Sequence, residues 1–592
     1  MRLTDLLGTW PQAQDTSLSG LDVAFAQWLQ QRQPSDDARH RWLAALVSHQ
    51  WSRGHACLDL GTVPEALGWS AVQGEALPAH LREAAANLPW CEGPDSPLVR
   101  ICDAQGRPHR LYLRRAWLAE QTIRDALTAR MADRPTVPAD LTMRLDALFG
   151  AAAASPDAPP DSPETPPDWQ RVACETAARH SVSLITGGPG TGKTTTVVRL
   201  LALLLDLATP HTLRIVLAAP TGKAAARLGE SIARQREHMP EAVRAHIPTH
   251  AQTLHRLLGN GPTPRDLAAD VVVVDEASMM DLEMMARLLS SVPASARLVL
   301  LGDRDQLASV EAGAVMAQLC DWAPLASHTV TLRHSHRFDA QRGIGQWAAA
   351  MQAHGSAEAL APLWQHTPTA PDPHADVTRW THDPSEAAFK ALLHQGWHDW
   401  LAWMAPHRAG TPCDDDQAAR LLHAFAGMGV LCALRDGPHG VLALTRRIER
   451  ALDMGPPDAL GWYVGRPVMV TRNDYALGLM NGDVGLCLPH PAGGWRVAFA
   501  RAEGGVRWLQ PSRLGAIDTV WAMTVHKSQG SEFGHVLLVV PQQDAPLLTR
   551  ELVYTGITRA RARLTLWAND ARVLLGACGR QVVRSGGLAD TP

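Results

Sequence analysis

A glycine-rich loop that ends in lysine and threonine limits the possible folds of this chain more than any other segment. Residues 187–194 read GGPGTGKT, the complete phosphate-binding pattern G-x-x-x-x-G-K-[ST]. The apolar run at 182–186 predicts a strand before the loop, and a helix is expected to begin near Lys193. The alternative is a glycine turn without a ligand, which would not need the whole pattern between a strand and a helix. We therefore predict a nucleotide site on an α/β domain.

The loop offers three kinds of contact to a triphosphate. Its backbone N–H groups face phosphate oxygens, the Lys193 ammonium reaches the β and γ phosphates, and the Thr194 hydroxyl reaches magnesium. ATP and Mg²⁺ are therefore the expected cofactors. The residues predicted to bind the nucleotide here are Gly187, Gly188, Pro189, Gly190, Thr191, Gly192, Lys193, Thr194 and Thr195.

Three further apolar runs, at 214–219, 271–274 and 297–301, predict strands that are buried on both faces of a parallel sheet. Each run is followed by a polar or glycine-containing segment. Because open parallel sheets bind ligands at the carboxyl ends of their strands, we expect the chemistry to gather at that edge.

Two carboxylates, Asp275 and Glu276, directly follow the run at 271–274. We expect Asp275 to hold magnesium and Glu276 to orient and deprotonate the attacking water, because phosphoryl transfer needs positioning and charge neutralisation. The alternative is a strand that ends in a solvated acidic turn. After the strand predicted at 297–301, Gln306 is a candidate sensor of the γ phosphate.

Two arginines of the second half, Arg337 and Arg559, are candidates to cross a domain cleft and reach transition-state charge. From the residues alone the competing interpretation is stronger, because an arginine is more often a surface cation.

The composition limits the partners and the location. A chain of 592 residues exceeds a single hydrophobic core and predicts roughly three or four domains. The formal net charge of -4 gives no overall basic surface, so a nucleic acid would have to bind in a local groove. The N-terminus shows no charged-then-apolar leader, and Arg199 and Asp206 interrupt the most apolar stretch. We therefore expect a cytoplasmic protein that does not contact a membrane.

The pattern along the chain predicts an α/β fold with two α/β domains, a mostly helical N-terminal domain and a small inserted β module. Trp397, Trp400 and Trp403 recur at near-helical spacing and are expected in the core rather than as base-stacking platforms. The predicted boundaries are 1–149 for the N-terminal domain, 150–167 for a Pro/Ala-rich linker, 168–330 and 331–592 for the α/β domains, and about 462–513 for the insertion.

An ordered set of motifs resembles superfamily 1 DNA helicases, and within them the RecD group, which includes the α subunit of exodeoxyribonuclease V. The RecD group is favoured by the chain length and by segments 465–474 and 481–485, and the similarity runs from about residue 170 to residue 567. The motifs are Gln170, GGPGTGKT, APTGKAAARL, TLHRLLG, VVVVDEASM, LLGDRDQL, SHRF, TVHKSQGSEF and YTGITRAR.

The resemblance implies two RecA-like domains that hydrolyse ATP in the cleft between them, an SH3-like insertion, and 5′-to-3′ movement on single-stranded DNA. It also implies a subunit that works beside RecB-like and RecC-like chains in double-strand break repair, recombination and degradation of linear DNA. The N-terminal domain would then be the docking surface for these partners.

The resemblance also assigns roles to individual residues. It places Gln170 against adenine and Gln306, Arg337 and Arg559 at the γ phosphate, with Gly530 and Glu532 near the nucleotide. Contacts to phosphates would position the DNA strand without reading its sequence. Lys223 and Lys527 have an alternative interpretation as solvated cations at helix ends. The candidate DNA contacts are Pro220, Thr221, Lys223, Thr253, His255, Thr524, His526 and Lys527.

The lysines argue against a nuclease in this chain. A nuclease of the D…E-x-K type has an acid two residues before its lysine, but Thr191, Thr221, Ala388 and Val525 occupy that place before the four lysines. We therefore expect a motor whose nuclease lies in a partner subunit.

Two other functions stay open at this point. The chain is also compatible with a self-sufficient RecD-like helicase, although such helicases usually carry a longer N-terminal region. A P-loop switch or scaffold that binds ATP without moving is a third possibility, but it leaves the two arginines and the segment TVHKSQGSEF without roles.

Overall fold

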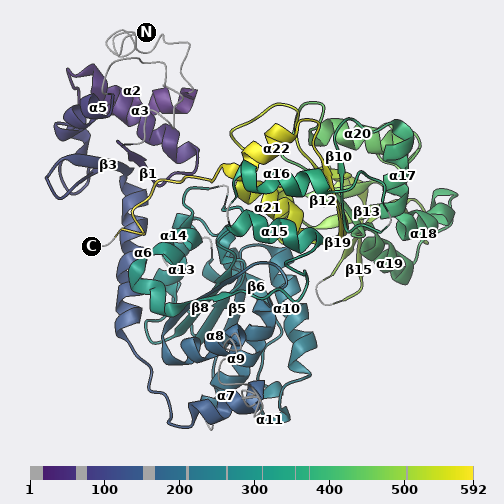
Figure 1. The fold of residues 1–592 in the computed structure, drawn as a ribbon, viewed down its shortest axis with the longest axis horizontal. Helices are drawn as coiled ribbons and strands as arrows, with labels where there is room; N and C mark the ends of the chain where they lie inside the picture. The colour runs from purple at the N-terminus through teal and green to yellow at the C-terminus, as the bar shows by residue number, and fades with distance from the viewer. Residues whose placement is uncertain are drawn as a thin grey trace.

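The computed structural model describes residues 18–590 except 62–76, 151–166, 209–211, 260, 262–264, 310, 354, 373 and 502–503. Figure 1 shows an N-terminal module joined by one long helix to two α/β domains. Two parallel sheets, a helical N-terminal module and an inserted antiparallel sheet confirm the predicted fold class. Nearly all of the predicted linker at 150–167 lies outside the described residues.

The first α/β domain is built on six parallel strands in the order β6-β5-β7-β8-β4-β9. Helices cover both faces, and β7 shows why: Val272 and Val274 pack into the core on one face, Val271 and Val273 into the core on the other. The strands are β4 Val182–Gly187, β5 Ile215–Ala219, β6 Ala251–Thr253, β7 Val271–Val274, β8 Arg297–Gly302 and β9 Thr329–Leu332.

Helices of this domain alternate with its strands, as parallel connections require. The predicted boundary after residue 330 falls inside β9, which belongs to the first sheet. The helices are α8 Trp169–Arg179, α9 Lys193–Ala208, α10 Gly222–Arg236, α11 Glu241–Arg244, α12 Leu254–Leu258, α13 Leu282–Ser291 and α14 Val315–Asp321.

The second α/β domain has five parallel strands in the order β10-β19-β18-β11-β17. Its strands are β10 Val377–Trp380, β11 Met428–Cys432, β17 Ala522–Thr524, β18 Phe533–Val539 and β19 Ala560–Trp567. Its helices are α15 Gly343–Ala353, α16 Ala357–His366, α17 Glu386–Gly396, α18 His398–Arg408, α19 Asp415–Phe425, α20 Val441–Ala451, α21 Arg550–Thr558 and α22 Ala571–Gly579.

The predicted insertion is a five-stranded antiparallel sheet in the order β15-β14-β13-β12-β16. Val468, Val497 and Phe499 are buried in a small core of its own. The predicted end at residue 513 is too early, because β16 closes the sheet beyond it. The strands are β12 Pro467–Val470, β13 Val484–Pro489, β14 Trp495–Ala500, β15 Val506–Leu509 and β16 Ile517–Thr519.

The N-terminal module combines helices with a three-stranded antiparallel sheet, β1-β3-β2, that the sequence did not predict. The long helix α6 leaves this module and packs against α13 of the first α/β domain. The elements are α2 Gly20–Arg32, α3 Ala38–Ser52, β1 Cys57–Asp59, α5 Leu77–Ala86, β2 Leu98–Cys102, β3 Pro108–Leu113 and α6 Arg114–Ala132. Helix α7 Leu141–Phe149, which the prediction placed in the N-terminal domain, packs instead with Leu141 and Leu145 into the core of the first α/β domain beside α8 and α9.

Residues 580–590, which we name the C-terminal strap, return from α22 to the N-terminal module (Figure 1, yellow). The amide of Ala56 donates to the carbonyl of Ser585 at 2.8 Å, and the amide of Gly587 donates to the Glu120 carboxylate at 3.0 Å. Leu588 is fully buried in a core shared with β1, α6 and the first α/β domain. The strap therefore links the second α/β domain to the start of the chain.

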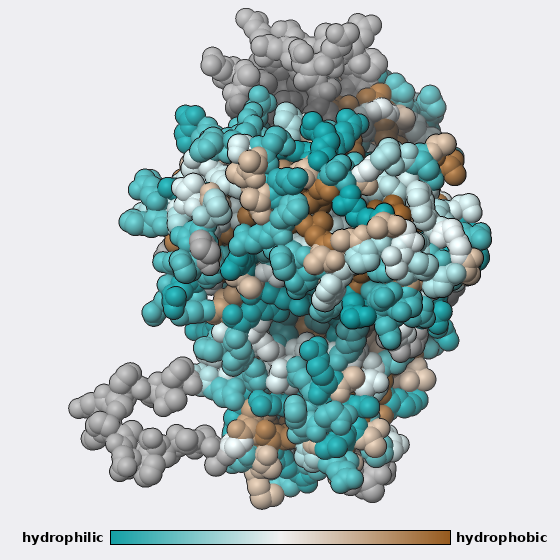
Figure 2. Space-filling model, turned by 90° about the vertical axis from the view of Figure 1, so that its right-hand side faces the viewer, coloured by the Kyte–Doolittle hydropathy of each residue, from teal (hydrophilic) through white to brown (hydrophobic). Residues whose placement is uncertain are grey.

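Among the described residues, few large hydrophobic side chains are exposed, and the face in Figure 2 is mostly hydrophilic with small separate apolar patches. Trp397 and Trp400 are core residues as predicted, but the prediction is wrong for Trp403, which is 46% exposed. Within the described residues, no helix combines the length and the apolar character needed to cross a membrane.

Candidate nucleotide and nucleic-acid site

A cavity of about 1360 Å³ opens at the carboxyl edge of the first sheet and is closed on its far side by the second α/β domain. It brings together most of the predicted nucleotide site. Gly187 and Gly188 do not line it. The predicted residues that do are Gln170, Pro189, Gly190, Thr191, Gly192, Lys193, Thr194, Thr195, Asp275, Glu276, Gln306, Arg337, Gly530, Glu532 and Arg559.

The glycine loop follows β4 and leads directly into α9. Gly190 and Gly192 have φ of 80° and 85°, a backbone region that favours glycine. A Cβ on Gly190 would lie 2.4 Å from the Cβ of Arg337, so this glycine also permits a close approach. The Lys193 ammonium donates to the carbonyls of Gly187 and Gly188, at 2.6 and 3.1 Å.

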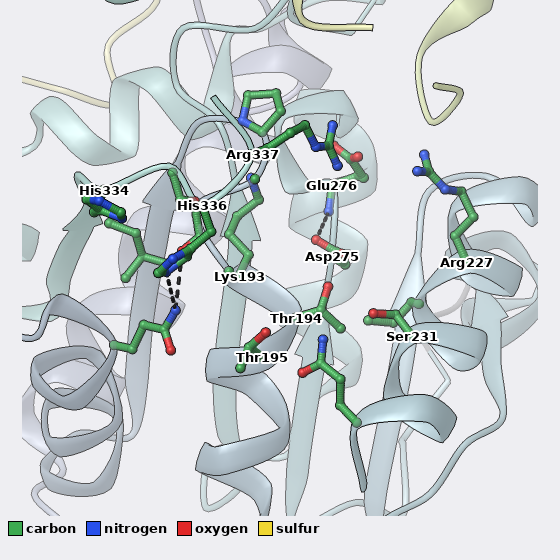
Figure 3. A pocket seen from close by; sticks show the side chains of 18 of the residues that line it. Lys193, Thr194, Thr195, Arg227, Ser231, Asp275, Glu276, His334, His336 and Arg337 are labelled. Carbon is green, nitrogen blue, oxygen red and sulfur yellow. Dashed lines mark hydrogen bonds between the residues drawn. The ribbon is translucent and has the colours of Figure 1, made fainter. Parts of the chain in front are cut away.

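Asp275 and Glu276 follow β7 and face the cavity beside the loop (Figure 3). Burial, together with the neighbouring Glu276, raises the pKa of Asp275 to about 6. Glu276 has a left-handed backbone with φ 54°, and its amide donates to the Asp275 carboxylate at 2.8 Å. A left-handed residue other than glycine is costly, and such strain tends to occur at functional positions. The turn therefore aims both carboxylates into one cavity.

Gln306 lies in a buried hydrogen-bond network between the two α/β domains. Its amide donates to the Asp303 carboxylate at 3.0 Å, and the Tyr554 hydroxyl of α21 donates to the same carboxylate at 3.1 Å. Burial raises the pKa of Asp303 to about 6. The Leu307 amide donates to the Thr555 hydroxyl at 2.9 Å. Residues 306–307 of the first α/β domain therefore meet residues 554–555 of the second.

Glu532 forms ion pairs with arginines from several parts of the chain. Its carboxylate lies 2.8 Å from Arg227 of α10, 2.9 Å from Arg337 after β9 and 3.1 Å from Arg561 of β19. Burial alone would raise its pKa, but Arg227 and Arg337 outweigh burial and lower it to about 2. Figure 3 shows Arg227 and Arg337 on opposite sides of Glu276. The cavity thus holds, among cations, a carboxylate that is ionised at neutral pH.

Arg559 is fully enclosed next to this cluster. Its guanidinium donates to the carbonyls of Thr555 and Ser531 at 3.2 and 3.3 Å. Burial lowers its pKa, although Glu276 and Glu532 oppose this effect. Arg337 and Arg559, which sequence patterns alone left ambiguous, therefore both reach the Lys193 cavity.

Gln170 marks the other end of the cavity, at the start of α8. Its side-chain oxygen accepts from Arg199 at 3.1 Å. Beside it, the Arg333 guanidinium lies 4.8 Å from the centroid of the Trp169 ring. His336 also lines this end, with its amide donating to the Gly190 carbonyl at 2.8 Å. Sequence reasoning assigned no site role to Arg333 or His336, although His336 lies inside the SHRF motif.

The candidate DNA residues lie outside this cavity. Thr221 and Thr253 cap the first turns of α10 and α12, accepting from Ala224 at 3.2 Å and Arg256 at 3.3 Å. Pro220 is half-buried just before α10, and His255 is exposed.

Both candidate DNA lysines contact other domains. The Lys223 ammonium donates to the Ser531 hydroxyl at 2.7 Å, and the Lys527 ammonium donates to Asp518 of the inserted sheet at 2.7 Å. Thr524 accepts from the Lys527 amide at 3.3 Å. His526, next to Lys527, has a pKa lowered by burial and by Arg584. The candidate DNA groups thus come from both α/β domains, beside the inserted sheet.

Three protein-family models match the chain. An AAA domain matches residues 170–312, a UvrD-like helicase C-terminal domain matches residues 519–567, and the N-terminal domain of RecBCD enzyme subunit RecD matches residues 14–110. These ranges fall on the first α/β domain, on the end of the second and on the N-terminal module.

Full-length relatives are similar across nearly the whole chain. RecBCD enzyme subunit RecD of Mycolicibacterium smegmatis is 38% identical, and the alignment covers 96% of this chain and 97% of the relative. The Haemophilus influenzae protein of the same name is 33% identical, with 92% of each chain covered. ATP-dependent RecD2 DNA helicase of Deinococcus radiodurans is 31% identical over 81% of this chain but only 58% of the relative. The chain therefore belongs to the RecD family of RecBCD enzyme subunits.

Proposed function

We propose that this chain is an ATP-dependent DNA helicase subunit that moves 5′ to 3′ along single-stranded DNA. The observation that carries the proposal is the shared cavity, which Lys193, Asp275 and Glu276 line from the first α/β domain and Glu532 and Arg559 from the second. A triphosphate between the domains would contact both, so its hydrolysis would change how they fit together.

The residues divide the chemistry of hydrolysis among them. Lys193 and the loop amides hold the phosphates, and Glu276 takes the proton of the attacking water. Arg337 and Arg559 stabilise the charge that develops on the γ phosphate, with Gln306 beside it. Gln170 and Thr195 are proposed to hold the rest of the nucleotide.

Thr194 and Asp275 are the residues proposed to hold magnesium. They lie next to each other on the cavity wall in Figure 3. Burial disfavours the Asp275 carboxylate, and a divalent cation would relieve that penalty, so the pair suits the ion. Bound magnesium neutralises charge on the β and γ phosphates.

On the DNA side, we propose that a single strand runs past Lys223 and Lys527, with Pro220, Thr221, Thr253, His255, Thr524 and His526. These groups come from both α/β domains, as a motor requires if its domains are to move along the strand in turn. Contacts of this kind hold phosphates and read no sequence.

We propose RecB-like and RecC-like partners, with the N-terminal module as the docking surface and the nuclease in a partner chain. Support comes from RecBCD subunits that match over nearly the full length and from a family model on residues 14–110. Affinity purification of the native protein, followed by identification of the bound chains, tests this. Recovery of the chain alone would favour a self-sufficient helicase, as would unwinding without partners.

Strand displacement tests the motor itself. The chain, alone and with its co-purified partners, should unwind a duplex with a 5′ tail in the presence of ATP and magnesium, and the chain alone should not unwind one with a 3′ tail. Hydrolysis of ATP without unwinding of either duplex would point to a switch or scaffold instead. Degradation of DNA by the purified chain alone would contradict the assignment of the nuclease to a partner.

A further inference from the structure

Helix α10 carries residues of both proposed sites. Lys223, a candidate DNA contact, lies in its first turn, and Arg227 follows four positions later. Residues at i and i+4 lie on the same side of a helix. Arg227 lines the nucleotide cavity, whereas Lys223 does not. One rigid turn of helix therefore separates the DNA side from the nucleotide side.

Lys223 and Arg227 both contact one short segment of the second α/β domain, residues 530–532. Lys223 donates to the Ser531 hydroxyl at 2.7 Å. Arg227 donates to the Gly530 carbonyl at 2.8 Å and forms an ion pair with Glu532 at 2.8 Å. The segment 530–532 therefore contacts α10 at three consecutive residues.

The segment 530–532 also lies between the proposed DNA site and the proposed nucleotide site. Lys527 precedes it on the DNA side, and it leads into β18 at Phe533. Arg559, a proposed γ-phosphate contact, donates to the Ser531 carbonyl at 3.3 Å. A movement of residues 530–532 would therefore reach both ligands.

Both ligands carry negative charge and would therefore compete for the cations of α10 that contact residues 530–532. Glu532 neutralises Arg227 and Arg337 in the nucleotide cavity, so an incoming γ phosphate competes with Glu532 for both arginines. A DNA phosphate likewise competes with Ser531 for Lys223. Burial lowers the pKa of Lys223, and the nearby positive charge of Arg227 lowers it further.

We propose that Arg227 is a positioning residue that couples the binding of single-stranded DNA to the binding and hydrolysis of ATP. The inference rests on the proposed function and adds a residue to it. Arg227 acts through the segment 530–532: nucleotide loosens its pair with Glu532, DNA loosens the pair of Lys223 with Ser531, and each event changes the fit of the other ligand.

Equilibrium binding tests the coupling directly. The Kd for a fluorescein-labelled oligothymidylate is measured by anisotropy with and without a non-hydrolysable ATP analogue and magnesium. In the wild-type chain with its partners, the two Kd values should differ by about fivefold or more, and DNA must change analogue affinity by the same factor. In Arg227→Ala the ratio should fall to within about twofold of unity. Arg227→Lys should restore part of it.

Arg561→Ala is the matched control, because it removes a third partner of Glu532 that comes from the same domain as Glu532 and does not bridge to α10. It should keep the wild-type ratio. If Arg227→Ala keeps the wild-type ratio of the two Kd values for DNA, the inference is overturned. It is also overturned if Arg561→Ala lowers that ratio as much as Arg227→Ala does, because the effect would then come from the charge of Glu532. A wild-type ratio of unity would also overturn it, while the strand-displacement assay decides separately whether the chain is a helicase.

Discussion

The ammonium group of Lys193 lies 2.6 Å from the carbonyl oxygen of Gly187 and donates a hydrogen bond to it. Its own loop thus holds the cation at the place where phosphate oxygens are proposed to bind. Lys193→Ala should lower ATP turnover by about a hundredfold or more, because transition-state charge loses a close cation. Circular dichroism and the midpoint of thermal unfolding should stay close to wild type. Near-normal DNA-stimulated turnover would refute the role.

Glu276→Gln separates binding from chemistry. The amide keeps the size of the side chain and the left-handed backbone at φ 54°, but it cannot accept the proton of water. Turnover should fall by about 10²- to 10⁴-fold, while a fluorescent ATP analogue should bind within a few-fold of wild type. Loss of nucleotide binding would instead show that Glu276 has a structural role.

Lys223 predicts a pH dependence of DNA binding. Burial and Arg227 lower its pKa to about 8, so the cation is present below pH 8 and is lost as the pH rises through that value. Affinity for single-stranded DNA should fall roughly three- to tenfold between pH 7 and 9 at constant salt, since one charged contact is lost. Lys223→Arg stays charged and should show a flatter profile. Identical profiles in both proteins would exclude Lys223 as the titrating group.

The pair of Lys527 and Asp518 can be separated by single substitutions on either side. Both side chains are partly exposed, at 43% and 41%, so the pair itself contributes little stability. Asp518→Asn should free the lysine and tighten DNA binding by up to about fivefold. Lys527→Ala should weaken binding and reduce the slope of log Kd against log salt by about 0.7. An unchanged slope would mean that Lys527 meets no phosphate.

Gly587 tests the C-terminal strap. A Cβ there would lie 2.7 Å from the Tyr112 hydroxyl and 3.0 Å from the Glu120 carboxylate. Gly587→Ala should therefore lower the free energy of unfolding by about 1–3 kcal/mol, as overpacking does, and limited proteolysis should cut more readily near the N-terminal module. Gly576 of α22 is the control, because a Cβ there meets nothing within 4 Å. Equal proteolysis of both variants would show that the strap is not held at Gly587.

Local sequence patterns predicted the glycine loop, four of the six strands of the first sheet and the carboxylate turn, because each depends on neighbouring residues, whereas β6 and β9 were not predicted. The pattern did not predict β1-β3-β2 or the true end of the insertion at Thr519, since short antiparallel strands are defined by distant partners. Arg227 was missed for the same reason. It lies inside the APTGKAAARL motif, but the motif alone assigns it no role, because its proposed role depends on a contact with Glu532 far along the chain.

The strap also sets an order of events during synthesis. His55 and Ser585 are 530 positions apart, yet their side chains meet, and Leu588 fills a core that begins at Ala56. A ribosome releases the first part of this chain long before it makes the strap, so Ala56 and Tyr112 emerge without Leu588, although the separate core within residues 26–111 is complete. The contact between the N-terminal module and the strap therefore forms only after both α/β domains have been synthesised.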